Sequence, residues 1–184
     1  MKRYLILLII TSLSFNACKN AFEKEAGQID SLMAIVKDTE NALLSVDTSR
    51  VFSTTRQMQK DIADINSVAD TLDKETAFKL ADYYSSKKQL YQLTSNYATY
   101  NTKINLAKKQ LNDLKQDLNN GLITKEKFSD YYRTEQMAVV ELNNEINRAI
   151  NGLEVRLQKM ELNRAEIADI IEKRKLKAEQ NNNE

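Results

Sequence analysis

The sequence predicts an all-α protein, and both its composition and its apolar patterning support this fold class. The 184 residues include no Pro and only three Gly. Sheet proteins need turn residues at short intervals, so this scarcity argues against strands. From Phe22 onward, apolar residues recur at alternating spacings of three and four, which is typical of helices that bury one face. We therefore expect an elongated antiparallel helical bundle built around a coiled-coil hairpin.

The first two expected helices are separated by the segment VDTSR. The first helix begins at Phe22, and the second follows Asp47, Thr48 and Ser49, which are residues that cap helix starts. Glu25 and Thr39 are polar members of the first apolar seam. The expected core positions of the two helices are Ile29, Leu32, Val36, Leu43, Thr55, Met58, Ile62 and Ile65.

The boundary after the second helix is expected within Asp70–Thr76, which contains capping residues but neither Gly nor Pro. A continuous helix would bring Thr76, Lys79 and Ser86 onto the apolar face, which favours a break. The alternative is a single helix over residues 49–118, which would give a three-helix layout.

The third helix has the clearest seam, with nine consecutive apolar a and d positions and no polar interruption. After it, Asn120 and Gly121 favour the left-handed backbone conformation that ends helices, and Thr124 can cap the next one. The nine seam residues are Leu90, Leu93, Tyr97, Tyr100, Ile104, Ala107, Leu111, Leu114 and Leu118.

The fourth helix has a mixed seam that runs from Tyr132 to Ile170. Glu135, Arg156 and Asn163 interrupt it, and we interpret these as residues that set helix register. A short loop makes the third and fourth helices antiparallel neighbours, so residues 74–118 and 125–178 should form a hairpin with the first two helices along it. The helical coiled-coil domain is expected over 22–178, followed by a polar tail over 179–184.

The N-terminus has the layout of a secretory signal. Lys2 and Arg3 precede an apolar segment of 12 residues, Tyr4–Phe15, which is shorter than the ~20 residues that span a bilayer. The following residues, Phe15-Asn16-Ala17-Cys18, resemble the lipobox of bacterial lipoproteins. Ala17 and Cys18 match that motif, whereas Phe15 and Asn16 depart from it.

This resemblance implies removal of residues 1–17 as a lipoprotein signal peptide and acylation of Cys18, for example with palmitate. Residues 18–21 would then form the lipidated N-terminus and a short tether. By analogy with the family, Lys19 lacks the acidic signal for inner-membrane retention. We therefore expect a location at the cell outer membrane, facing the periplasm, with the helical body close to the lipid.

Several kinds of chemistry are disfavoured by composition. The chain has no His and a single Cys, so it cannot form a Ser-His-Asp or Cys-His site, nor a typical zinc site. The turn at Gly121 resembles half of an EF-hand loop, but Lys127 occupies the place of the bidentate Glu. We expect no metal, no cofactor and no enzymatic activity. The net charge of +1 also argues against nucleic-acid binding.

The expected function is therefore binding. Tyr83, Tyr84 and Tyr91 are candidate partner contacts, because tyrosine offers a large contact area at low entropic cost. The protein would act as a lipid-anchored scaffold, spacer or adaptor for an unknown protein partner, or would pair with its own copies. The alternative is a carboxylate-dependent hydrolase, or an accessory subunit of an envelope enzyme complex.

Overall fold

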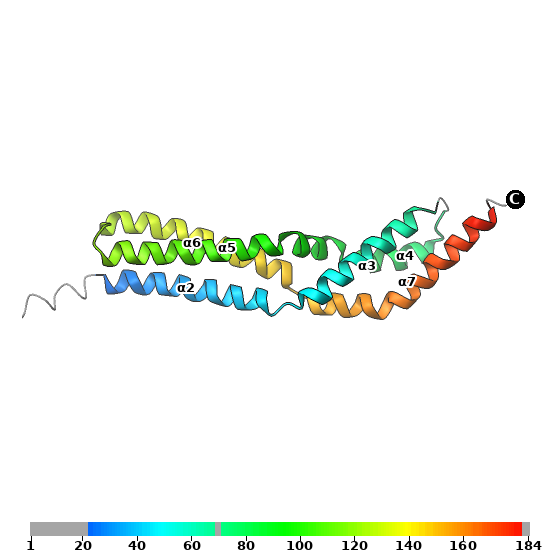
Figure 1. Ribbon diagram of the computed structural model, residues 1–184, viewed down its shortest axis with the longest axis horizontal. Helices are drawn as coiled ribbons and strands as arrows, with labels where there is room; N and C mark the ends of the chain where they lie inside the picture. Colours follow the sequence, from blue (N-terminus) through cyan, green and yellow to red (C-terminus); the bar gives the residue numbers. More distant parts are fainter. Residues whose placement is uncertain (1–21, 69–70, 182–184) are drawn as a thin grey trace, which may run out of the picture. The chain divides into compact units, whose positions relative to one another are not determined.

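The computed structural model describes residues 22–68 and 71–181, and all regular secondary structure within these ranges is helical. This confirms the all-α prediction. The predicted signal peptide and Cys18 lie outside the described residues. The helices are α2 (Glu23–Leu44), α3 (Thr48–Asn66), α4 (Lys74–Tyr84), α5 (Lys87–Asn119), α6 (Lys125–Ile150) and α7 (Leu153–Asn181) (Figure 1).

The expected helix boundaries are present. The carboxylate of Asp47 caps α3 by accepting a hydrogen bond from the amide of Arg50 at 2.9 Å, and Asp73 caps α4 through the amide of Thr76 at 2.9 Å. The gap between α3 and α4 confirms the expected break and excludes a single helix over 49–118. Gly121, after α5, has a φ of 67°, the left-handed conformation that ends helices.

Two further interruptions were not expected, and the prediction of continuous helical arms over 74–118 and 125–178 is wrong. Ser85 and Ser86 separate α4 from α5, and the Ser85 hydroxyl donates to the Asp82 carbonyl at 2.6 Å. Serine competes in this way with the helical backbone pattern. Asn151 and Gly152 separate α6 from α7, and Gly152 has a φ of 67°. Beyond this break, α7 continues to Asn181.

The chain forms two compact units within the range expected as one domain. Unit 1 contains residues up to Asn41 together with Asn101–Asn144. Unit 2 contains Ala42–Tyr100 together with the residues from Glu145 onward. Helices α5 and α6 therefore contribute to both units.

Unit 1 packs α2 beside the adjoining parts of α5 and α6 (Figure 1). Lys115 bonds Asp30 at 2.5 Å and Lys108 pairs with Glu40, so α2 and α5 are antiparallel. The core of unit 1 confirms the expected seam from Ile29 to Val36 on α2 and from Ile104 to Leu118 on α5, whereas Tyr97, expected in the earlier part of the α5 seam, is half-buried. The buried apolar residues of this core are Ile29, Leu32, Val36, Ile104, Ala107, Leu111, Leu114, Leu118, Phe128, Val139 and Leu142.

Two polar residues, Thr39 and Glu135, accompany the apolar core of unit 1. The buried hydroxyl of Thr39 is 2.8 Å from Oδ1 of Asn143. Glu135 is half-buried, and this burial raises the pKa of its carboxyl group. Desolvation disfavours the charged form of this carboxyl group, and Glu135 forms no salt bridge with any residue that the structure describes.

Unit 2 packs α3, α4, the first part of α5 and α7 together. The α7 seam differs from the expected one: Leu157 is 2 % exposed, whereas Arg156 is half-buried and donates to the Asn151 carbonyl at 3.1 Å. Leu153, Met160 and Ile167 keep their expected core positions, whereas Leu157 rather than Arg156 is buried between Leu153 and Met160. The buried apolar residues of α7 are Leu153, Leu157, Met160, Ile167 and Ile171.

A side chain from α5 stabilises this turn. The amide nitrogen of Gln89 donates to the carbonyl oxygens of Ala149 and Asn151, each at 2.9 Å. These carbonyls lie at the end of α6, where the helix provides no backbone partner.

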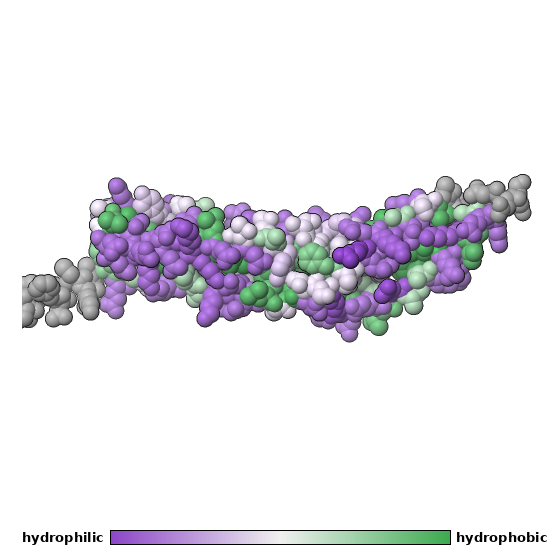
Figure 2. All heavy atoms as spheres, viewed as in Figure 1, coloured by the Kyte–Doolittle hydropathy of each residue, from purple (hydrophilic) through white to green (hydrophobic). Residues whose placement is uncertain are grey.

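The surface is mainly hydrophilic on the face in Figure 2, with apolar residues in separate patches. Over the described helices, no segment has both the length and the apolar character needed to span a membrane.

Candidate functional site

A concave surface of unit 2 follows the seam between α3 and α7. Arg50, at the start of α3, bonds Glu154 and Glu161 of α7 at 2.7 Å each. Further along, Lys175 of α7 pairs with Asp64 of α3 at 3.0 Å. The two helices are therefore parallel along this seam. The hydrogen bonds from Arg50 hold the pKa of the Glu161 carboxyl below its usual range.

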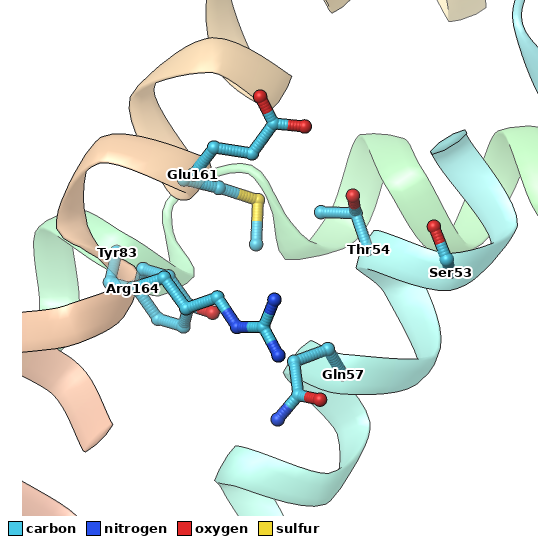
Figure 3. A pocket seen from close by; sticks show the side chains of 7 residues that line it. Ser53, Thr54, Gln57, Tyr83, Glu161 and Arg164 are labelled. Atoms are coloured by element: carbon cyan, nitrogen blue, oxygen red, sulfur yellow. The ribbon is translucent and has the colours of Figure 1, made fainter.

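The first hollow on this seam is a cavity of about 210 Å³, called here the Arg164 cavity (Figure 3). The Arg164 side chain extends from α7 toward Gln57 of α3, with the Tyr83 ring beside it. Within the described part of the chain, Arg164 forms no salt bridge. The cavity is lined by Ser53, Thr54, Gln57, Tyr83, Met160, Glu161 and Arg164.

The second hollow has a volume of about 360 Å³ and is called here the α3–α7 groove. It shares Gln57 with the Arg164 cavity, so the two hollows adjoin along one seam. Its walls combine charged side chains with an apolar strip from α7. The groove is lined by Gln57, Lys60, Asp61, Asp64, Ala168, Ile171, Glu172, Lys175 and Leu176.

Asp61 is the buried polar residue of this groove, with 6 % of its surface exposed. The Tyr83 hydroxyl donates to its Oδ2 at 2.9 Å, and the Gln57 amide donates to its Oδ1 at 2.8 Å. Both oxygens accept hydrogen bonds, which is the arrangement that suits an ionised carboxylate. No lysine or arginine among residues 22–68 and 71–181 forms a salt bridge with Asp61.

Two tyrosines surround this carboxylate. Burial and the hydrogen bond to Asp61 raise the pKa of the Tyr83 hydroxyl, and burial together with the Asp61 charge raises the pKa of Tyr84. Their rings meet edge to face with centroids 5.1 Å apart. The Tyr84 hydroxyl is buried and has no hydrogen-bond partner among the described residues. Tyr83 therefore remains a protonated donor to Asp61 at neutral pH.

The structure does not bring the three predicted contact tyrosines onto one open surface. Tyr83 is 4 % exposed because it reaches inward to Asp61. Tyr84 and Tyr91 are half-buried, and the Lys87 ammonium lies 5.7 Å from the centroid of the Tyr91 ring. Partner contact by these residues stays a prediction, and the position of Tyr83 gives it a second role in orienting Asp61.

Sequence reasoning did not identify Asp61 or Gln57. Asp61 lies three residues after Met58 and four before Ile65, so it has the spacing of a core position, but Ile62 beside it was the stronger candidate. Ile62 is half-buried in the structure. Asp61 can be buried because Tyr83 of α4 and Gln57, one turn earlier on α3, donate hydrogen bonds to it. The position of Gln57 can be recognised from the sequence spacing, whereas the contact with Tyr83 can be recognised only from the tertiary structure.

The described residues contain no group of three or more Cys, Asp or Glu side chains placed to hold a metal ion. Comparisons with protein-family models, with curated proteins and with solved structures each found no match.

Proposed function

We propose that this protein is a lipid-anchored component of the cell envelope that binds a protein partner through unit 2 and has no catalytic role. The observation that carries the proposal is the pair of adjoining hollows along one seam between α3 and α7. Concave surfaces with apolar walls and a few convergent polar groups are the usual places for ligands to bind. The scaffold, spacer or adaptor role follows from combining such a surface with a membrane anchor.

The anchor is supported by the sequence. A basic start, an apolar segment of 12 residues and the pair Ala17-Cys18 together resemble a lipoprotein signal. Two or three acyl chains would hold the protein at the membrane effectively permanently. Growth of cells with an alkyne fatty acid should label the wild-type protein and not the Cys18→Ala variant. Equal labelling of the two proteins would contradict the anchor.

Partner binding is testable with a photo-crosslinking amino acid placed at Lys60, an exposed residue on the rim of the α3–α7 groove. The matched control is Lys109, which is exposed on α5 in unit 1 and pairs only with Asp113 on its own helix. We expect a defined adduct in intact cells from position 60 and none from position 109. The same adducts from both positions, or none from either, would contradict binding through this seam.

Self-association is a second candidate. Val155 and Leu162 lie seven residues apart on α7 and are 70 % and 78 % exposed. This spacing places them on one helix face, where a second copy would cover them. Light scattering on the full chain in detergent should then give a dimer mass that Leu162→Lys reduces to the monomer mass. A monomer at all concentrations would exclude this candidate.

Hydrolysis is the alternative from another class, since Asp61, Asp64 and Glu172 all line the α3–α7 groove. Asp64 is paired with Lys175, and both oxygens of Asp61 accept hydrogen bonds, so two of the three carboxylates already have partners. We therefore favour binding. Turnover of 4-nitrophenyl glycosides that disappears in Asp61→Asn would instead support the hydrolase.

A further inference from the structure

We infer that the α3–α7 groove binds a lysine side chain presented by the protein partner, with Asp61 as the buried counter-charge. This inference rests on the proposed partner-binding function and names the chemistry that the partner must supply. It is argued from the charge, the walls and the size of the groove.

The charge of the groove favours one cation. Its lining includes the carboxylates of Asp61, Asp64 and Glu172 against the ammonium groups of Lys60 and Lys175, which gives a net charge of −1. Lys175 and Asp64 neutralise each other at 3.0 Å. Asp61 is buried and forms no salt bridge among the described residues, and the unpaired Arg164 lines the adjoining cavity rather than this groove. A carboxylate in a low-dielectric environment gains most from an incoming opposite charge.

Asp61 is also held in place for this role. Tyr83 and Gln57 each donate to a different carboxylate oxygen, at 2.9 and 2.8 Å, so the side chain cannot rotate away without losing a bond. Each carboxylate oxygen has a second lone pair available to an ammonium group. The site therefore needs little rearrangement to accept a cation.

The walls select a cation on an aliphatic chain rather than a small inorganic ion. Ala168, Ile171 and Leu176 line the groove from α7. A lysine side chain places its methylenes against such a surface while its ammonium group reaches a polar partner. The groove volume of about 360 Å³ is large compared with the ~30 Å³ that one water molecule occupies in the liquid, so it has room for a side chain of this length.

The experiment uses the full chain labelled with ¹⁵N in detergent micelles, and three probes. The first is the blocked peptide Ac-Ala-Leu-Lys-Leu-Ala-amide, the second replaces its Lys with uncharged norleucine, and the third is n-butylammonium. We expect the lysine peptide to shift the amide signals of Lys60, Ala168 and Leu176 saturably. Its affinity should be at least equal to that of butylammonium and about tenfold above that of the norleucine peptide.

Asp61→Asn keeps the size of the side chain and should weaken binding of the lysine peptide by about tenfold, without changing the norleucine peptide. Glu172→Gln, at the exposed rim of the groove, should weaken binding of the lysine peptide by about twofold. This variant replaces Asp61→Asn in the test if circular dichroism shows that Asp61→Asn does not fold. The matched control is Asp113→Asn in unit 1, which should leave binding unchanged.

Three results would overturn the inference: equal binding of the lysine and norleucine peptides, tighter binding of free butylammonium than of the peptide, or unchanged affinity in Asp61→Asn, with Glu172→Gln taking its place if Asp61→Asn does not fold. None of these would remove an in-cell adduct at position 60, so failure here is distinguishable from failure of the adaptor role. Loss of that adduct with intact lysine-peptide binding would instead contradict the adaptor role alone.

Discussion

Units 1 and 2 are both built from packed helices, yet they differ in the number of polar residues that are buried in their cores. Unit 2 contains Thr55, Asp61 and Ser86 among the buried residues that the structure describes, whereas unit 1 contains Thr39. Unit 2 also contains the interruptions at Ser85–Ser86 and Asn151–Gly152 and both hollows of the α3–α7 seam. The departures from a regular apolar repeat therefore occur in the unit that contains the candidate site.

The largest expected effect tests the displaced seam of unit 2. Leu157→Ala should lower the free energy of unfolding by about 3 kcal/mol, because it removes a fully buried side chain and leaves a cavity. Arg156→Ala, the matched neighbour, should cost under about 1 kcal/mol. Urea unfolding followed by circular dichroism measures both. If Arg156→Ala lowered the free energy of unfolding more than Leu157→Ala, the result would support the seam that the sequence alone predicts, with Arg156 in the core.

Next in size is the hydrogen bond that holds Asp61. Tyr83→Phe keeps the ring but leaves Oδ2 of a buried carboxylate without its donor, so we expect a loss of about 2 kcal/mol. Thr39→Val in unit 1 removes a hydroxyl whose neighbour Asn143 is half-exposed and can bind water, and should cost under about 1 kcal/mol. Equal losses in urea unfolding would mean that the two cores treat polar groups alike.

Alkaline pH should weaken unit 2 through the same tyrosine. The folded-state pKa of Tyr83 lies above its ordinary value near 10, so above pH 10 the unfolded chain loses a proton that the folded chain keeps. The contribution of Tyr83 to the free energy of unfolding is fully present below pH 10. Above pH 10 it falls by about 1.4 kcal/mol per pH unit. Unfolding at pH 9 and pH 11 measures the slope. The slope should be smaller in Tyr83→Phe, and an identical slope would assign the effect to other groups.

The smallest effect compares the two glycine turns. Gly121→Ala and Gly152→Ala each place a methyl group on a backbone with a φ of 67°, which costs about 1 kcal/mol. At Gly152 the added carbon would also lie 2.8 Å from Nη1 of Arg156, whereas nothing lies within 4 Å at Gly121. Thermal unfolding should show the larger loss for Gly152→Ala. Adding Arg156→Ala should remove the difference between the two.

Much of the fold was predictable from the sequence because its signals are local. Asp47, Asp73 and Gly121 act on the backbone within one turn of their own positions, and the seam from Leu90 to Leu118 repeats without a gap. The break at Gly152 also had a local signal, since Asn151-Gly152 repeats the dipeptide Asn120-Gly121. This signal was outweighed by the apolar spacing, which continues from Ile146 through Ala149 to Leu153 and predicts a single helix.

The candidate site was less predictable because its parts act across helices. In the sequence, Asp61 is one charged residue among many. In the structure, Tyr83 of α4 and Gln57 of α3 donate hydrogen bonds to its two carboxylate oxygens. Charge alone predicts exposure for an aspartate, and only tertiary contacts reverse that expectation. The tyrosine cluster did indicate this part of the chain, although as a surface rather than as the support of a buried acid.

The hydrogen bonds of Gln89 have a consequence for the chain lengths that this architecture tolerates. One residue inserted between Gln89 and Leu90 would rotate Gln89 by about 100° relative to the buried face of α5 and turn its amide away from the carbonyls of Ala149 and Asn151. An insertion directly after Leu122, which is 69 % exposed in the loop between α5 and α6, would leave the hydrogen bond from the Leu122 amide to the Asp117 carbonyl in place. Natural length variation should therefore accumulate in that loop, while the spacing from Gln89 to the buried Leu93 changes only together with the α6–α7 turn.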